Sequence, residues 1–475
     1  MDRRLSCAAR GIRGICLPRA PKRLSLWKCG RAVFVGCAMA LLLVQPGLAQ
    51  VFSLTKNGFT LNVGFKAGLG GVATGNTNFG AGTLRPNGDL QHDVTYGEAY
   101  LLPKVDLSYD TGNSGTLYGG VSFVAVGTRG GDPANFTVDS PSAVDLDQLY
   151  AGWRSGKVFS SLGNDAIDVS VGPQIYNIGD GFIIWDGHLD TGKDAGYWLA
   201  PRFAFENAGI IKVNTKPVSG ALFYLKGDPN QDSSELAGGN VDYKNDKFGT
   251  FGGTYFQIFN SNDSGTFIRN GMDVIDGRAF DVPVPYLPNL KLRGEFAHEW
   301  GNDHGITIDA NGWYGAATYS LADILPWSPS LTYRYSFFSG DNDPTDRTSN
   351  AFDPLFYYGP GTWGTWFQGE IVGEYLLFNS NEIAQMVNLS VNPTDKINAG
   401  LLFFDFTLDK NNYFGTPVSD RHFADEIDLY VNYNITDHIY FAVVGALAFP
   451  GAAAKEVFGS NEVYQLIESQ VVVTY

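Results

Sequence analysis

The sequence predicts an all-β protein, a single transmembrane antiparallel β-barrel of about 18 strands, with 16 as the alternative number. Three observations support this prediction. Apolar residues alternate with polar ones along many segments of strand length. The connections between these segments are of two kinds, short and polar or long and rich in Gly, Asp and Asn. The final segment, 462–475, keeps a strict period of two up to its last residue, which is aromatic.

The final segment predicts how the barrel closes. Val471, Val473 and Tyr475 share one face, and the opposite face is mostly polar. This pattern is similar to the terminal signal of bacterial outer-membrane barrels, where the last strand is recognised by the insertion machinery and pairs with the first strand. An ordinary edge strand of a β-domain is the alternative, and this segment alone leaves both open. In a barrel we expect these three residues to face lipid beside the strand at 59–69.

The first 49 residues have the organisation of a secretory signal peptide. Nine Lys or Arg residues precede an apolar run at 32–44, and small residues, Gly47 and Ala49, occupy positions −3 and −1 of an expected cleavage after Ala49. This run is too short to cross a bilayer. We therefore expect residues 1–49 to be removed and residues 50–475 to form the barrel, in the outer membrane of a Gram-negative bacterium.

The composition excludes several classes of protein. All four cysteines lie within residues 1–49, so residues 50–475 can form no disulfide, zinc-thiolate site or cysteine nucleophile. Residues 50–475 contain 24 Lys and Arg and 48 Asp and Glu, which gives a net charge of −24. Nucleic acid is thus not an expected partner. No apolar run after residue 49 approaches 18 residues, which excludes a helical membrane protein.

Period-two alternation places the expected strands along the chain. They cover residues 59–69, 94–109, 116–127, 145–155, 166–176, 199–213, 218–227, 247–260, 270–280, 289–300, 305–320, 328–338, 363–378, 382–392, 396–408, 423–435, 438–449 and 462–475. Short connections such as 214–217 and 392–395 alternate with long ones such as 177–198 and 409–422, which predicts short periplasmic turns and long extracellular loops. The long segment 339–362 breaks this alternation. Either it hides another strand, or a middle strand is divided wrongly.

Alternation also sorts the charged residues of the expected strands. A charge on the lipid face costs about 2–4 kcal/mol at mid-membrane, so charged residues should face the lumen. The inward candidates are the bases Arg154, Arg202, Arg293 and Arg334 and the acids Glu206, Glu295, Glu370 and Glu374. They predict either a charged constriction that selects an anionic solute or mutually satisfied salt bridges that fill the wall, and the sequence leaves both open.

Several motifs resemble the alginate-export family of outer-membrane porins. They are Gly172-Pro173-Gln174-Ile175-Tyr176-Asn177-Ile178-Gly179-Asp180-Gly181-Phe182-Ile183, Tyr333-Arg334-Tyr335-Ser336-Phe337-Phe338-Ser339-Gly340-Asp341, Asn379-Ser380-Asn381 and Asn392-Pro393-Thr394-Asp395. The family has arginine where this chain has Pro173. The resemblance covers about residues 165–475. It implies an 18-stranded monomeric barrel whose arginine-lined lumen passes an anionic polysaccharide outward.

The sequence favours a channel over an enzyme. It has no G-x-S-x-G, H-E-x-x-H or phosphate-binding motif, and its six histidines are scattered, as expected for solvent-facing loop residues. No cofactor or metal is expected. Asp341, Asp343 and Asp346 could hold calcium, although an acidic loop without that role is commoner. A structural or adhesive barrel with a closed lumen and a general diffusion porin are the alternative functions. Expected partners are lipid, lipopolysaccharide, the insertion machinery, periplasmic polysaccharide-export proteins and an anionic solute.

Overall fold

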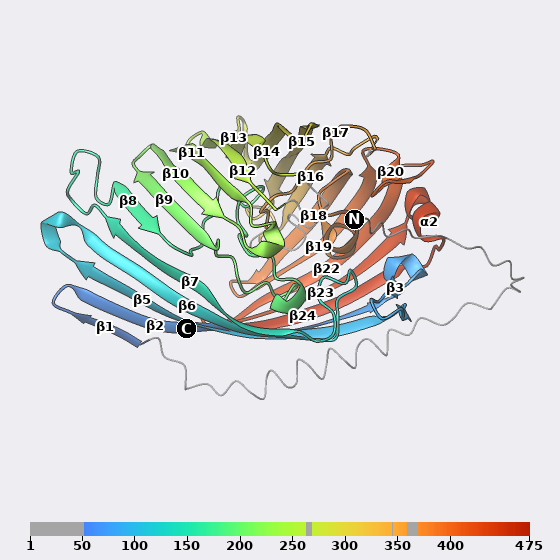
Figure 1. The fold of residues 1–475 in the computed structure, drawn as a ribbon, viewed down its shortest axis with the longest axis horizontal. Coiled ribbons are helices and arrows are strands. Elements are labelled where there is room, and N and C mark those ends of the chain that lie inside the picture. The colour runs from blue at the N-terminus through green and yellow to red at the C-terminus, as the bar shows by residue number, and fades with distance from the viewer. Residues whose placement is uncertain (1–51, 263–267, 344, 359–367) are drawn as a thin grey trace, which may run out of the picture.

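The computed structural model describes residues 52–262, 268–343, 345–358 and 368–475. Residues 1–49, the predicted signal peptide, lie outside the described residues. Eighteen strands pair in a closed antiparallel barrel (Figure 1). These wall strands are β2 (Phe59–Gly75), β5 (Val94–Asp110), β6 (Thr116–Arg129), β7 (Ser142–Arg154), β8 (Ile167–Val171), β9 (Asn207–Asn214), β10 (Val218–Lys226), β11 (Glu235–Asn245), β12 (Gly249–Asn260), β13 (Met272–Val284), β14 (Leu287–Asp303), β15 (Ile306–Ser320), β16 (Ser330–Phe338), β18 (Glu382–Thr394), β19 (Ile397–Leu408), β22 (His422–Thr436), β23 (Ile439–Pro450) and β24 (Tyr464–Thr474).

The remaining elements are short. The strands outside the closed wall are β1 (Phe52–Lys56), β3 (Thr83–Leu84), β4 (Leu90–Gln91), β17 (Thr348–Ser349), β20 (Asn412–Tyr413) and β21 (Thr416–Pro417). The helical segments are η1 (Thr77–Gly80), η2 (Gly112–Ser114), η3 (Gly192–Asp194), η4 (Pro229–Gln231), the π-helix η5 (Gly369–Leu377) and α2 (Ala452–Phe458). Among the described residues, no helix is long and apolar enough to cross a membrane.

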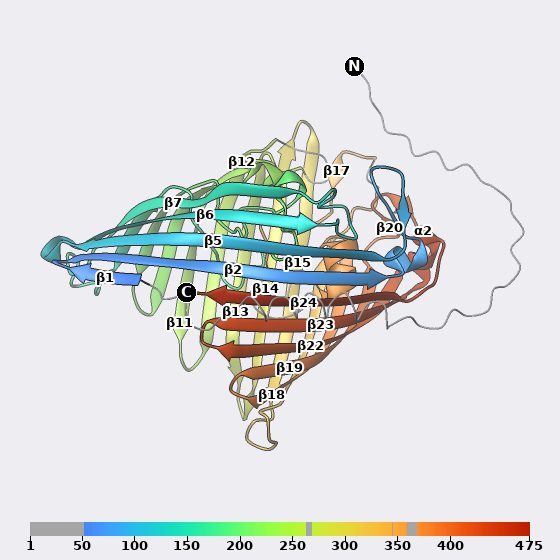
Figure 2. The same ribbon diagram turned by 90° about the horizontal axis from the view of Figure 1, so that it is seen from below.

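The wall closes between its first and last strands. β24 pairs antiparallel with the second half of β2, with Val471 opposite Leu69, and Figure 2 shows the two strands side by side. β1 pairs with the start of β2 and continues the same edge. Tyr475 extends the seam, because its N–H donates to Phe65 O at 2.9 Å and its carbonyl accepts from Phe65 N at 2.8 Å. The predicted pairing of the last strand with the strand at 59–69 is confirmed.

Connections of different length lie on the two rims of the barrel. On one rim, β9–β10, β11–β12, β13–β14, β18–β19 and β22–β23 are joined by two or three residues each. The opposite rim carries the longest connections, 172–206 and 339–381, and also the short β14–β15 turn. We call the first the short-turn rim and the second the long-loop rim. The segment 339–362, which broke the expected alternation, therefore belongs to a long-loop connection.

The predicted strand at 363–378 is wrong. Its described part forms the π-helix η5, whose residues are all buried, so Ile371 and Tyr375 do not face lipid as they would in a wall strand. A segment packed inside the barrel is apolar for the same reason as a lipid-facing strand, because both leave water. Conversely, β11 lies between the expected strands 218–227 and 247–260, where the sequence predicts no strand. One strand was thus added and one missed, and the predicted number of 18 is still confirmed.

Side chains on the wall strands alternate between the two faces. In β16, Arg334 and Ser336 are buried toward the interior, whereas Leu331 and Tyr333 are exposed on the outer face. The same alternation buries Glu295 and Glu299 of β14 and exposes Phe296. The sorting predicted for these two strands is confirmed.

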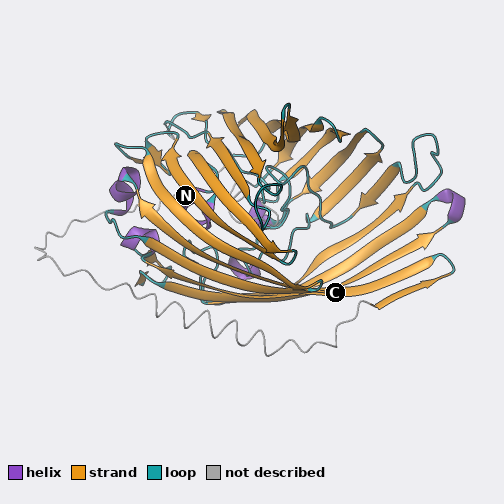
Figure 3. Cartoon of the chain, turned by 180° about the vertical axis from the view of Figure 1, so that it is seen from behind, coloured by secondary structure: helices purple, strands orange, loops and turns teal. Residues whose placement is uncertain are grey.

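The interior of the barrel is packed by inserted loops (Figure 3). In the β8–β9 loop, Ile184 forms a β-bridge with Phe356 of the β16–β18 loop, and both belong to a buried cluster that includes wall residues such as Phe223. The helix η5 forms a second cluster with β18, β19 and β22 to β24. The core therefore lies inside the barrel, and the described parts of the loops 172–206 and 339–381 narrow its lumen.

Candidate functional site in the barrel interior

An arc of inward-facing bases follows the wall from β2 to β14. The pairing of β7, β8 and β9 shows how the wall builds it, because Arg154 lies opposite Asp168, which lies opposite Lys212. Each of these residues occupies the inward position of its strand. The members, which we call the basic arc, are Lys66, Lys104, Arg154, Lys212, Lys244, Lys291 and Arg293.

The basic arc lies in the half of the barrel next to the short-turn rim. Each member stands in the half of its strand that is nearer to that rim, and none is buried. The strands β18, β19, β22, β23 and β24 carry neither Lys nor Arg. Positive charge is therefore concentrated on one side of the lumen, where solvent can reach it.

Arg154 and Arg293 are the two sequence candidates that belong to the basic arc. Arg154 Nε lies 3.3 Å from Asp168 Oδ2, and its guanidinium stacks 4.4 Å from the Tyr118 ring. Arg293 Nη1 lies 3.2 Å from Asp180 Oδ2, which belongs to the β8–β9 loop. Both side chains stay accessible, with 47% and 41% of their surface exposed.

Arg334 and Arg202 occupy buried positions instead. Arg334 faces inward from β16 and donates to Gln368 Oε1 at 3.0 Å. Arg202 does not lie on a wall strand, because β9 begins only at Asn207. It belongs to the β8–β9 loop, where it pairs with the buried Asp190. The nearby Phe205 does not face lipid either, because its ring is fully buried against Phe356.

The acidic candidates are divided between three environments. Glu206 precedes β9 and its carboxylate lies 3.0 Å from Lys226 Nζ, on the outer side of the wall, so it does not face the lumen as expected. Glu295 is buried on the inner face of β14. Glu370 and Glu374 lie on η5, close to Glu468 of β24. Within the described part of the chain, none of these acids forms an ion pair with a candidate base.

Sequence reasoning missed a buried charge cluster on β13. Arg278 Nη1 lies 2.6 Å from Asp276 Oδ1, and Nη2 lies 2.8 Å from Asp242 Oδ1 on β11. The alternation of Val274, Asp276, Arg278 and Phe280 was available as a signal, because these residues share one face of the expected strand 270–280. Asp242 could not be found in this way, since β11 itself was not recognised.

The acidic loop Asp341, Asp343 and Asp346 uses its carboxylates locally. Asp341 Oδ1 accepts from Asp343 N at 3.1 Å, and Asp346 Oδ1 accepts from Thr348 N at 2.6 Å. Thr345 donates from its N and Oγ1 to Asp343 Oδ1. Among the described residues, these three aspartates are not one of the groups whose ligand atoms converge.

Three groups of side chains in the described part of the chain bring possible metal ligands together. They are His188 with Asp194 and Asp228, Asp405 with His422 and Asp425, and Glu370 with Glu374 and Glu468. His188 is not a solvent-facing histidine as expected, because only 21% of its side chain is exposed. Burial lowers the pKa of His188 to about 3 and raises the pKa of Asp228 to about 7.

Comparisons with known proteins agree with the barrel. The model of the family described as alginate export matches residues 228–466. The fold is similar to OccK8 (OprE) of Pseudomonas aeruginosa, with a TM-score of 0.54, 11% identity and coverage of 87% of this chain and 97% of that chain. It is also similar to a BenF-like porin from Pseudomonas fluorescens Pf-5, with a TM-score of 0.53, 10% identity and coverage of 87% and 98%. For OccK5 (OpdH) of P. aeruginosa the TM-score is 0.53 and the identity is 10%, with coverage of 87% of this chain and 98% of that chain.

No curated protein matches the chain by sequence comparison. At these identities the solved structures establish the fold alone, while the family match covers half of the chain. Family and fold together identify an outer-membrane porin barrel of a Gram-negative bacterium. The chain belongs to the alginate export family.

Proposed function

We propose that the barrel conducts an anionic hydrophilic solute, of the class of an acidic polysaccharide, across the outer membrane. The basic arc is the observation that carries this proposal. Guanidinium and ammonium groups lining a lumen attract anions and lower the barrier to their passage. The family to which the chain belongs is described as exporting alginate, which is a polymer of this class. Outward passage would begin at the short-turn rim, where the basic arc lies.

Ion pairs neutralise only part of the positive charge of the basic arc. Three of its members are ion-paired, Lys104 with Asp106, Arg154 with Asp168 and Arg293 with Asp180. The other four form no ion pair within the part of the chain that the structure describes. The net charge of −24 is therefore not distributed evenly, and the accessible wall of the short-turn half favours anions.

A barrel with a closed lumen is the second candidate, because the inserted loops pack against the inner wall. The buried bridge between Ile184 and Phe356 joins two such loops across the interior. In this case the protein would serve as a structural or adhesive barrel, and it would pass no current. Conductance through planar lipid bilayers separates the two functions directly.

The main test compares ion selectivity between variants. In a salt gradient we expect the reversal potential of the wild type to show preference for anions. Arg154→Gln together with Arg293→Gln should shift it toward cations, because two accessible charges leave the lumen. Lys226→Gln is the matched control, since this base lies on the outer side of the wall beside Glu206. An unchanged reversal potential in the double variant would contradict the role of the basic arc.

A second test addresses the solute class. A polyuronate added on the short-turn side should interrupt the current, and a neutral polysaccharide of equal length should not. Equal block by both polymers would favour a general diffusion porin. We infer that lipid and lipopolysaccharide surround the barrel, that the insertion machinery assembles it, and that periplasmic export proteins deliver the polymer to the short-turn rim.

A further inference from the structure

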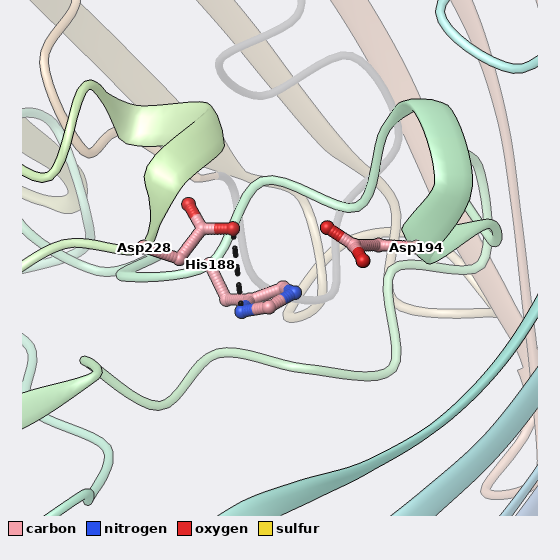
Figure 4. A group of neighbouring side chains, drawn as sticks. All are labelled: His188, Asp194 and Asp228. Carbon is pink, nitrogen blue, oxygen red and sulfur yellow. Dashed lines mark ion pairs between the residues drawn. The ribbon is translucent and has the colours of Figure 1, made fainter.

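A histidine and two aspartates converge where two inserted loops meet inside the barrel. His188 and Asp194 belong to the β8–β9 loop, and Asp228 caps η4 in the β10–β11 loop (Figure 4). One ligand atom from each side chain lies within 4.8 Å of the other two. His188 Nδ1 is 3.5 Å from Asp228 Oδ2, and Figure 4 shows both carboxylates directed toward the imidazole.

Two buried polar atoms at this point have no hydrogen-bond partner among the described residues. The Asp228 side chain is 2% exposed, and its Oδ1 accepts from Gln231 N at 2.9 Å, whereas Oδ2 has no donor. His188 Nε2 is also buried without a hydrogen bond. A buried oxygen that lacks a donor costs about 1–3 kcal/mol, so a ligand for Oδ2 would remove this cost. This observation is independent of the clustering of the acids.

The charges around the site are not balanced by the described residues. Asp186, Asp190 and Asp228 are all buried, and His188 lies between two of them, with Nε2 3.6 Å from Asp190 Oδ1 and Nδ1 3.5 Å from Asp228 Oδ2. Arg202 is the base in contact with this group, and it pairs with Asp190 and also reaches Asp145 at 3.5 Å. Buried carboxylates are usually paired or coordinate a metal. A divalent cation would supply the missing positive charge.

The donor set indicates the class of cation. An imidazole nitrogen with two carboxylate oxygens suits zinc and neighbouring first-row transition ions, whereas calcium prefers six to eight oxygens. Zinc binds these ligands at about 2.0–2.2 Å. Ligand atoms spread over as much as 4.8 Å would need only a small contraction to reach a common centre.

We propose that His188, Asp194 and Asp228 form a site for a divalent transition-metal ion of the zinc class, which fastens the β8–β9 loop to the β10–β11 loop. Asn230 already supports this junction, because its Nδ2 donates to Asp194 Oδ2 and to Leu189 O, both at 2.9 Å. The β8–β9 loop also carries Asp180, the partner of Arg293 in the basic arc. The ion would therefore hold the loop that borders the lumen. The site does not depend on the proposed function, since it rests on the geometry of the loops alone.

The first experiment measures zinc binding to the full-length barrel, refolded in detergent and freed of metal by a chelator. Equilibrium dialysis with elemental analysis should give one tightly bound zinc per chain. We expect His188→Ala and Asp228→Asn to weaken the affinity at least about tenfold. Asp228→Asn keeps the Oδ1 that caps η4. This variant therefore still tests zinc binding if His188→Ala fails to fold. Heat-modifiable migration on gels establishes that each variant has formed the barrel.

His422→Ala is the matched control, because His422 belongs to the second histidine–aspartate group, with Asp405 and Asp425 on β19 and β22. Zinc binding unchanged in this control and weakened in the two site variants would support the proposal. Loss of binding in the control alone, or no zinc bound by the wild type at micromolar concentration, would overturn it.

Cobalt and calcium test the class of ion. Cobalt bound at the site should give a visible d–d absorption spectrum that disappears in His188→Ala, because the imidazole is then no longer a ligand. Calcium should compete with zinc only at a concentration at least about tenfold higher. Equal competition by calcium would overturn the assignment to the zinc class.

Discussion

Arg269 and Asp353 form a two-point ion pair inside the barrel, with Nε 2.6 Å from Oδ2 and Nη2 2.8 Å from Oδ1. Arg269 lies in the β12–β13 connection, three residues before β13 begins at Met272, whereas Asp353 lies in the β16–β18 loop. Both side chains are buried. The pair therefore fastens an inserted loop to the barrel wall through two parallel charge-assisted hydrogen bonds.

Replacing one member of this pair should destabilise the protein strongly. We expect Asp353→Asn to lower the free energy of unfolding by about 3–5 kcal/mol, because the buried Arg269 loses its carboxylate. Urea unfolding in detergent micelles, followed by tryptophan fluorescence, measures the change. Glu206→Gln is the control, since the Glu206–Lys226 pair is partly exposed and should contribute only about 0–1 kcal/mol. Equal effects of the two variants would contradict a role of the buried pair in stability.

Gly400 provides room for the aromatic ring of a neighbouring strand. A Cβ at this position would lie 2.5–2.6 Å from Tyr430 Oη, Cε1 and Cζ, so the ring would have to move. We expect Gly400→Ala to destabilise the barrel by about 1–3 kcal/mol, measured as a lower urea midpoint. Gly277→Ala is the matched variant, because a Cβ there meets no atom within 4 Å. A change no larger at Gly400 than at Gly277 would show that Tyr430 adapts.

Tyr475 should stabilise the seam between β2 and β24. Its ring stacks on His438 at a centroid distance of 4.2 Å and on Phe65 at 5.7 Å. We expect Tyr475→Ala to lose about 0.5–1.5 kcal/mol for each aromatic pair and to leave single-channel conductance unchanged. Tyr475→Phe should keep both contacts. If the phenylalanine variant were as unstable as the alanine variant, the stacking interpretation would be wrong.

The mature protein should begin at Gln50. Mass spectrometry of protein isolated from outer membranes measures this directly. We expect Ala49→Leu to leave the precursor uncleaved, because the residue before the cleavage site must be small. Gln50→Asn lies beyond the recognised residues and should be processed normally. A mature mass that includes residues 1–49 would refute the signal peptide.

The number of strands and most of their positions followed from alternation, and the two errors have physical causes. In β11 the outward residues at the centre of the strand are small, Ala237 and Gly239, so only Val241 and Tyr243 form a short apolar stripe on the outer face. In η5, the spacing of four residues between Glu370 and Glu374 is typical of one side of a helix. The apolar residues between them are equally compatible with a strand, so the sequence did not decide between the two. Alternation with period two therefore predicts a wall strand reliably only where the outward side chains are large and apolar.

The candidate site was predictable only where the wall forms it. Arg154 and Arg293 were placed correctly inside, because strand alternation determines their direction. Arg202 and His188 could not be placed, because the β8–β9 loop folds into the interior and pairs with residues from distant loops. Sequence periodicity carries no information about such contacts. The Arg269–Asp353 pair was missed for the same reason.

The seam between β2 and β24 has a consequence for the order of assembly. In every other pair of neighbouring wall strands, the two strands follow one another in the sequence of wall strands, whereas Leu69 and Val471 at the seam lie about 400 positions apart. Local hairpins can therefore form as soon as their own residues are available, but the seam requires nearly the whole chain. During assembly, the edge of β2 that pairs with β24 therefore stays unpaired longer than the other strand edges. A chain arrested during synthesis would expose this edge, so the time between export of β2 and arrival of β24 sets its risk of aggregation.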